Sequence, residues 1–311
     1  MTDFMTRALP GTAVVCDGRC AVRQEEGGQM EVKVLGPLEA YENGRSVTPS
    51  ASKPRQILAL LALQANQVVT VPSLIEELWG MNSPRSALTT LQTYILQLRR
   101  LIDAAPAGGP AQPATGQPGT KSRGAKDVLV TLHGGYRLSV APGAVDVQTY
   151  ERLATAGREA AELGDYESAS SRLRAAMDLW RGQVLVDVPL GPSLAIEVAR
   201  LEESRLGVLE ARIDADLRLG RHLTLLSELA VLTGRYGMHE NLYAQYMIAL
   251  YRAGRRWRAL EVFTALRTTL VDQLGVEPSK RLQDLQQAIL NSDPSLDDPV
   301  SHDLRQRQLV G

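Results

Sequence analysis

The chain has 311 residues, of which 44% are hydrophobic and 22% charged, and its formal net charge is −1 at pH 7. This composition is typical of a globular protein, and the length is sufficient for two independent cores. No stretch reaches the roughly 18 uninterrupted apolar residues of a membrane span, and residues 1–43 lack the basic start and apolar core of a signal peptide. We therefore expect a cytoplasmic protein with no membrane partner.

Charge is distributed unevenly along the chain. Residues 31–140 contain 11 Lys plus Arg against 7 Asp plus Glu, a net charge of +4, whereas residues 146–290 contain 18 against 20, a net charge of −2. The first half therefore carries the positive field to which an anionic partner would respond.

Residues 1–29 combine glycine, charge and scattered apolar residues without a period, and we expect a flexible N-terminal extension there. The chain has only two cysteines, Cys16 and Cys20, and both lie in this extension. Two cysteines cannot build a disulfide framework or a four-cysteine zinc site. We interpret them as free thiols in preference to a redox or metal-binding pair.

A small antiparallel sheet is expected first, because residues 31–35 and 38–41 alternate polar and apolar and Asn43-Gly44 is a hairpin signal. An apolar helix should then run over residues 53–63, with Pro54 in its first turn. Val68–Thr70 is interpreted as a short extended link. A second helix should begin at Pro72 and end at Gly80, and the candidates for its buried face are Leu74, Leu78 and Trp79.

A third helix is predicted to be capped by Ser83-Pro84 and to run to about Asp103. Apolar residues recur in it every three or four positions, which predicts one buried stripe. The stripe consists of Leu88, Leu91, Ile95, Leu98 and Ile102. The opposite, polar face consists of Thr89, Thr90, Thr93, Gln97 and Arg100.

Residues 104–125 are rich in Pro, Gly, Ala and Gln, and we interpret them as a flexible insertion. Residues 128–132 and 136–140 then have the pattern of a hairpin joined by a glycine-containing turn at His133. Three helices followed by a hairpin is the order of a winged helix-turn-helix. The sequence therefore predicts a winged-helix domain over residues 30–142.

The remainder is predicted to be an all-α domain of helical repeats over residues 145–290, followed by a flexible tail at 291–311. Amphipathic helices are joined in pairs at Gly164, Gly220 and Gly254. The 34 positions between the last two glycines match the tetratricopeptide period, whereas the 56 positions between the first two require an insertion, which we place at residues 183–193. The predicted fold is thus mainly α with a small β part.

The third helix is the strongest functional signal, because an outer face of Thr, Gln and Arg suits the major groove of DNA. Any surface helix has polar residues outward, but the hairpin that follows favours DNA reading. Base contacts are assigned to residues drawn from Arg85, Thr89, Thr90, Thr93, Gln97 and Arg100. Backbone contacts are assigned to Arg137 and His133 on the wing, to Lys53 and Arg55 as a further option, and to Arg99 with its helical phase open.

Enzyme patterns are weak by comparison, and we predict no catalytic residues, cofactor or metal. Ser50-Ala-Ser-Lys53 has the spacing of an acylating serine, but its partner motifs are absent. Residues 116–122 are similar to a phosphate loop, but Thr120 interrupts the motif and no strand precedes it. The four histidines are dispersed, and His222 and His239 are interpreted as ordinary residues of repeat helices. Tyr136, Trp180 and Trp257 are interpreted as packing groups.

The combination resembles the Streptomyces antibiotic regulatory protein family, which joins an OmpR-type winged helix to a bacterial transcriptional activation domain. The resemblance covers roughly residues 30–290 and rests on seven short motifs in order. They are Lys53-Pro-Arg-Gln-Ile-Leu58, Leu74-Ile-Glu-Glu-Leu-Trp79, Ala87-Leu88 with Leu91-Gln92 and Leu98-Arg-Arg-Leu101, Gly135-Tyr-Arg-Leu138, Leu179-Trp-Arg-Gly182, Ile248-Ala-Leu-Tyr-Arg-Ala-Gly-Arg255 and Gln273-Leu-Gly-Val-Glu-Pro278. Two departures are the insertion at 104–125, which could loosen the wing, and Gly237 where the family commonly has proline.

The resemblance implies a transcription activator of an antibiotic gene cluster. It implies binding to direct repeats in double-stranded promoter DNA and contact with RNA polymerase and its principal sigma factor. We further expect the repeat domain to support self-association on that DNA. With no receiver domain before the winged helix and no ATPase module after it, control by receiver phosphorylation or nucleotide hydrolysis is not expected. Two alternatives stay open: a protein-interaction scaffold built on the repeats, and a regulator that senses a small ligand among them.

Overall fold

A computed structural model of the chain describes residues 30–105 and 124–297. The expected extension at 1–29, most of the insertion at 104–125 and the last part of the tail at 291–311 lie outside the described residues. So do Cys16, Cys20 and the loop-like motif at 116–122.

The chain begins with a three-stranded antiparallel sheet. Its strands, in spatial order, are β1 (Met30–Lys33), β2 (Glu39–Glu42) and β3 (Arg45–Ser46). The predicted hairpin at Asn43-Gly44 is confirmed, because these residues have φ of +54° and +73° between β2 and β3. Both values lie in the left-handed region that two-residue turns of this type require.

The helix-turn-helix and wing follow the first sheet. The helices are α1 (Ser52–Leu63), α2 (Val71–Trp79), α3 (Ala87–Asp103) and the short α4 (Ala125–Val128). A second sheet has the order β4-β6-β5, formed by β4 (Val69–Thr70), β5 (Leu129–Leu132) and β6 (Gly135–Leu138). Ile57 and Leu60 of α1 pack with Leu74 of α2 and Leu91 of α3, all essentially inaccessible to solvent.

Two predictions about α3 are wrong in detail. The helix begins at Ala87, three residues after Pro84, because residues 84–87 form a turn in which the Pro84 carbonyl accepts from the Ala87 N–H. Leu88 is half-exposed at 50% instead of buried, because Ala87 takes the first core position and leaves Leu88 at the edge of the stripe. The other four predicted core residues are buried.

The second half is helical, as predicted. Its helices are α5 (Asp146–Glu162), α6 (Tyr166–Met177), α7 (Pro192–Arg218), α8 (His222–Arg235), α9 (Glu240–Arg252), α10 (Arg256–Leu274), α11 (Lys280–Asn291) and the 3-10 turn η1 (Pro294–Leu296). Gly164, Gly220 and Gly254 have φ of +79°, +73° and +72° at the turns that join helices in pairs. This left-handed conformation is the reason that glycine recurs there.

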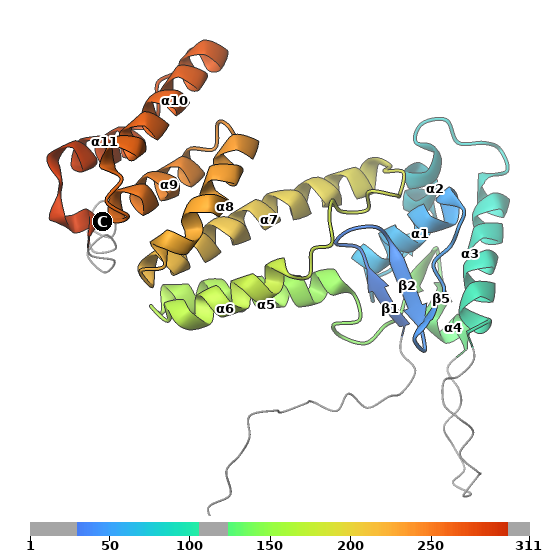
Figure 1. Cartoon of the computed structure of the whole chain (residues 1–311). Helices are drawn as coiled ribbons and strands as arrows, with labels where there is room; N and C mark the ends of the chain where they lie inside the picture. Colours follow the sequence, from blue (N-terminus) through green and yellow to red (C-terminus); the bar gives the residue numbers. More distant parts are fainter. Residues whose placement is uncertain (1–29, 106–123, 298–311) are drawn as a thin grey trace, which may run out of the picture.

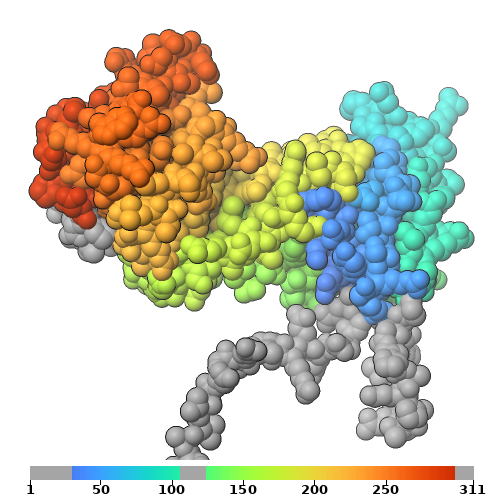
Figure 2. Space-filling view, viewed as in Figure 1, coloured from blue at the N-terminus to red at the C-terminus, as the bar shows by residue number. Residues whose placement is uncertain are grey.

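The two halves share one hydrophobic core. The core runs from the first sheet and α1 to residues of α5, α6 and α7 such as Tyr150, Leu173 and Leu201. Winged helix and repeat helices therefore lie directly against each other, with α8–α11 at the far end of the molecule (Figures 1 and 2). The molecule is mainly α with a small β part, a winged helix-turn-helix followed by helical repeats.

The insertion predicted inside the repeats makes much of this contact. The non-helical segment between α6 and α7 donates the N–H of Arg181 to the Leu35 carbonyl and the N–H of Leu185 to the Gly36 carbonyl. Asp187 accepts from the Leu38 N–H at 2.9 Å. The segment that interrupts the repeat period, residues 181–191, thus forms a clasp against the winged helix.

A second set of contacts involves the start of α5. The Asp146 carboxylate accepts from the Val34 N–H at 2.8 Å and the Leu35 N–H at 3.0 Å. Burial raises the pKa of this carboxyl above its ordinary value, although the two N–H groups and Arg181 oppose the rise. The first sheet and α5 are thereby joined by a buried polar contact.

Candidate nucleic-acid interface

Helix α3 lies along the edge of the molecule opposite to the repeat helices (Figure 1). One side, consisting of Ala87, Leu91, Ile95, Leu98 and Ile102, is buried. The other side faces solvent and is unobstructed by the second half of the chain. A groove-binding helix requires this combination of an anchored side and a free side.

The free side carries most of the predicted base-reading residues. Thr89, Thr93, Gln97 and Arg100 are exposed and Thr90 is half-buried. The Thr93 hydroxyl donates to the Thr89 carbonyl at 3.0 Å, so its remaining surface offers an acceptor oxygen and a methyl group. Arg85 is exposed in the turn before α3, beyond the end of this face.

The electrostatic character of this face is positive. No acidic residue occurs from Leu78 to Ile102, whereas the same stretch contains Arg85, Arg99 and Arg100. The first acidic residue after this stretch is Asp103, at the C-terminal end of α3, and the arginines before it favour the approach of a polyanion.

The side chains of Arg99 and Arg100 lie in different environments. The Arg99 guanidinium donates to the Leu129 carbonyl at 3.0 and 2.6 Å and to the Thr131 hydroxyl at 2.7 Å, both on strand β5. This resolves the phase that the sequence left open: Arg99 joins the recognition helix to the wing, and Arg100 points to solvent.

The wing is also held where the insertion leaves and rejoins the described chain. The Asp103 carboxylate at the end of α3 accepts from the Ala125 N–H at the start of α4 at 2.9 Å. Ala105 and Ala125 are both buried. The placement of the wing is therefore set by contacts that bypass the insertion.

The turn of the wing presents His133, which is exposed beside Gly134 at φ +76°. Strand β6 passes so close to β4 that a Cβ on Gly135 would lie 2.4 Å from the Val69 carbonyl oxygen. Arg137 is half-buried on β6, and its Nε is buried without a hydrogen-bond partner. His133 is thus the more accessible of the two predicted wing contacts.

The cationic groups of Lys53 and Arg55 bind other groups of the protein. The Lys53 ammonium donates to the Leu78 carbonyl, and Arg55 donates to the Pro49 carbonyl and pairs with Asp187 of the clasp. The Arg55 side chain is only 15% exposed. The structure therefore places Arg55 at the junction of the halves and engages Lys53 with the end of α2.

Two residues on the free side of α3 were missed by the sequence prediction. Gln92 is exposed, and Leu96 is 47% exposed between polar neighbours. Both could have been found by placing each residue at about 100° steps around the helix instead of selecting polar residue types.

Residues 46–111 match the family described as transcriptional regulatory protein, C terminal, and residues 145–290 match the bacterial transcriptional activator domain. The regulatory protein DnrI of Streptomyces peucetius is 59% identical over 268 residues, which cover 86% of this chain and 94% of DnrI. The chain belongs to the Streptomyces antibiotic regulatory protein family. Membership makes it a DNA-binding transcription activator of secondary-metabolite genes.

Other members of the family differ in length. Regulatory protein AfsR of Streptomyces coelicolor is 39% identical over 88% of this chain, but the match spans only 25% of AfsR. A solved structure of Mycobacterium tuberculosis EmbR, in complex with a low-affinity phosphopeptide, superposes with a TM-score of 0.78. It has 29% sequence identity, and the superposition covers 91% of this chain and 71% of EmbR.

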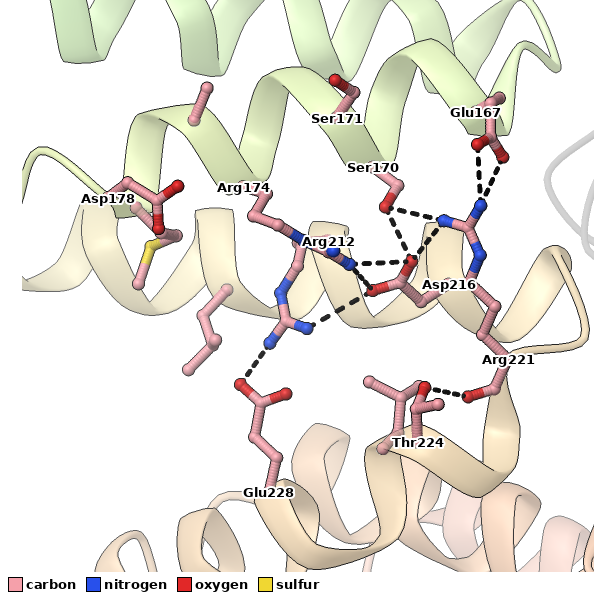
Figure 3. Close-up of a pocket in the computed structure, with 14 residues that line it drawn as sticks. Glu167, Ser170, Ser171, Arg174, Asp178, Arg212, Asp216, Arg221, Thr224 and Glu228 are labelled. Atoms are coloured by element: carbon pink, nitrogen blue, oxygen red, sulfur yellow. Dashed lines mark hydrogen bonds and ion pairs between the residues drawn. The ribbon is translucent and has the colours of Figure 1, made fainter.

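The repeat domain of this family member also contains a cleft of about 930 Å³ between α6, α7 and α8 (Figure 3). At its centre the Asp216 carboxylate is 1% exposed and accepts from the Ser170 hydroxyl at 2.6 Å. Arg174, Arg212 and Arg221 surround it at 3.2, 3.4 and 3.1 Å. Burial alone would raise the pKa of Asp216, but these hydrogen bonds and charges outweigh it and hold the pKa below its ordinary value.

Two of the three arginines of this cleft, Arg212 and Arg221, also pair with a second carboxylate. Arg221 donates to both oxygens of Glu167 at 2.7 Å, and Arg212 pairs with Glu228. Figure 3 shows the side chains turned toward one another across the cleft. The arrangement supports a joint between three helices, because its charges are already neutralised by one another.

Two tryptophans that the sequence predicts as packing groups differ in the structure. Trp257 is not a packing group, because it is 70% exposed, whereas Trp180 packs edge-on against Tyr150 at 5.3 Å.

Across residues 30–105 and 124–297, no group of three or more His, Cys, Asp or Glu side chains could hold a metal ion. In the same ranges, no helix is both long and apolar enough to cross a membrane.

Proposed function

We propose that the chain activates an antibiotic biosynthetic gene cluster by binding direct repeats beside a promoter and recruiting RNA polymerase. The observation that carries this is the free side of α3, which is polar, has no acidic residue before Asp103 at the end of the helix, and lies on the edge of the molecule away from the repeats. Such a protein acts in the cytoplasm, where the promoter DNA is. We infer that residues 30–142 bind DNA and residues 145–290 form the activation domain.

In this proposal the base contacts come from Thr89, Thr93, Gln97 and Arg100. Positions 89 to 100 span about 16 Å along the helix, a length that fits within one passage through the major groove. Arginine can donate two hydrogen bonds to guanine, and glutamine can pair with adenine. Thr90 and Arg85 lie at the side and at the start of this face and serve as flanking contacts.

Contacts with the DNA backbone are assigned to His133 and Arg137 on the wing. Arg99 acts indirectly in this scheme, because it holds the wing at a fixed distance from α3 through Leu129 and Thr131. Lys53 and Arg55 are removed from the proposed contacts, because their cationic groups are engaged within the protein.

The activation domain is proposed to contact RNA polymerase, including its principal sigma factor, and to support self-association on adjacent repeats. Its most prominent exposed aromatic group is Trp257 at the start of α10, which is flanked by the exposed Arg255, Arg256 and Arg258. Tryptophan and arginine are the residues most enriched where protein interfaces gain their binding energy. This group is therefore our candidate polymerase contact.

The deciding experiment is a footprint of the purified protein on promoters next to its own gene, at 50 and 200 mM salt. If about four phosphates are neutralised, affinity should fall roughly 10²-fold between these concentrations. Discrete, salt-sensitive protection over spaced direct repeats would support the proposal. A folded protein that protects no DNA at either salt concentration would instead favour the scaffold alternative or a required effector.

A further inference from the structure

Leu96 lies in the middle of the polar face of α3. It is 47% exposed, and its neighbours one turn away are Gln92, Thr93, Arg99 and Arg100, of which Arg99 turns to strand β5. These residues are three or four positions from Leu96, so their side chains are adjacent to it on the helix. The protein itself thus leaves a large alkyl group uncovered at the centre of the surface that faces DNA.

In the major groove, one group matches an alkyl side chain. Base edges present hydrogen-bond donors and acceptors, and the C5 methyl of thymine is the alkyl group among them. We propose that Leu96 is a specificity determinant that reads thymine by packing against this methyl group. The inference rests on the proposed function, because it requires α3 to lie in the major groove.

Neighbouring residues fix where that thymine should be. Arg100 is one turn further along α3, about 6 Å in axial rise, which corresponds to at most roughly two base pairs along the DNA. Since arginine pairs best with guanine, the target should contain a thymine within about two base pairs of a guanine. Thr93 adds a second methyl group to the same patch. Its hydroxyl donates its proton to the Thr89 carbonyl, so the side chain has no donor left for a base.

Leu88 is a matched control on the same helix. It is 50% exposed, which is equivalent to Leu96, but it lies three residues before the buried Leu91 and seven before the buried Ile95. It therefore flanks the core side of α3 and not the polar face. Both leucines are exposed enough for alanine, the best helix former, to replace them without unfolding the domain.

The test uses the promoter fragment protected by the wild-type protein, made with thymine or with deoxyuridine at individual positions. Deoxyuridine removes only the C5 methyl and keeps every donor and acceptor. At one position near a guanine, the substitution should weaken wild-type binding about three- to fivefold, as expected for one buried methyl group. Leu96→Ala should bind the thymine fragment more weakly than wild type and respond to that substitution by less than about 1.5-fold. Leu88→Ala should respond like wild type.

The other outcomes overturn the assignment in distinguishable ways. Wild-type protein that protects the fragment but is insensitive to deoxyuridine at every position would remove the thymine reading and leave DNA binding intact. Equal deoxyuridine sensitivity in Leu96→Ala and wild type would show that another residue packs on the methyl group. Wild-type protein that protects no DNA at all would overturn both this inference and the proposed function. The deoxyuridine series on wild type does not depend on any variant.

Discussion

The carboxylate of Glu77 on α2 accepts a hydrogen bond from the N–H of Gly191, at the start of α7, at 2.7 Å. Its other oxygen accepts from the N–H groups of Ser193 and Leu194 at 2.8 and 3.2 Å. Helix α7 has no side-chain cap of its own and no acidic residue in its first turn. A residue of the helix-turn-helix therefore caps the longest helix of the repeat domain, and this couples the winged-helix half to the repeat half.

Replacement of Glu77 by alanine should destabilise the protein by about 2–4 kcal/mol, because it leaves buried N–H groups of α7 without acceptors. Glu77 is 2% exposed, whereas the adjacent Glu76 is exposed, so Glu76→Ala is the control and should change stability by less than about 0.5 kcal/mol. Urea unfolding monitored by circular dichroism measures both. Equal free energies of unfolding for the two variants would contradict the capping role.

This cap requires glycine at position 191 because there is no room for a side chain, and not because of the backbone conformation. A Cβ at position 191 would lie 2.1 Å from the Glu77 carbonyl oxygen, although φ of −89° suits any residue. Gly191→Ala should therefore destabilise the protein by about 2 kcal/mol or more and separate α2 from α7. Gly207→Ala, in the open middle of α7, should instead stabilise by about 0.5–1 kcal/mol through helix propensity. Thermal unfolding of the two variants should show opposite shifts, and shifts of the same sign would be inconsistent with the close contact.

The sequence was sufficient to predict the elements whose pattern is local. The apolar period of α3, the hairpin at Asn43-Gly44 and the glycine turns of the repeats depend on residues a few positions apart, so their patterns were visible in the sequence. The predicted start of the third helix is too early because Ser83-Pro84 is also a good cap signal. No local signal distinguishes a turn there from a first helical turn.

Contacts between distant residues could not be predicted in the same way. The clasp at 181–191 was visible only as an interruption of the repeat period, and nothing in the sequence pairs Asp187 with Arg55 or Glu77 with Gly191. Consequently the charge of Lys53 and Arg55 alone made them a further option for contacts with the DNA backbone. The error over Trp257 has the same origin, because a tryptophan in a repeat helix is ambiguous until the face that it occupies is known.

Arg99 and Arg100 are adjacent in sequence and should have separable effects. Arg100→Ala should lower affinity for the specific site by about 1–3 kcal/mol and relax the preference at one base pair, without loss of stability. Arg99→Ala should lower the melting temperature and weaken binding to all sequences, because it releases β5 from α3. Binding titrations against a set of single-base variants, together with melting curves, measure both effects. Identical binding profiles for the two variants would refute the division of roles.

Trp257→Ala is expected to separate activation from DNA binding. The side chain is 70% exposed on α10, far from α3, so its loss should leave the footprint and the melting temperature unchanged. Loss of an aromatic anchor at an interface should weaken the polymerase contact by about 2 kcal/mol, and transcription in vitro with purified holoenzyme should fall accordingly. Val231→Ala, equally exposed at 70% on α8, serves as the control. Full activation by Trp257→Ala would move the polymerase contact elsewhere.

The lowered pKa of Asp216 should make the stability of the protein depend on pH in a specific way. The pKa of this carboxyl in the folded protein lies below the ordinary value of 3.8, so its contribution is present above that value and disappears as the pH falls through the lower, folded pKa. Asp216→Asn keeps the shape and the acceptor for Ser170 but leaves three arginines facing a neutral group, and should destabilise the protein by about 2–4 kcal/mol at pH 7. The difference in unfolding free energy between wild type and variant should stay constant from pH 7 to about pH 5 and shrink below about pH 4. Urea unfolding across this range tests it, because a difference that persists unchanged to pH 3 would mean that the carboxylate charge is not what stabilises the joint between α6, α7 and α8.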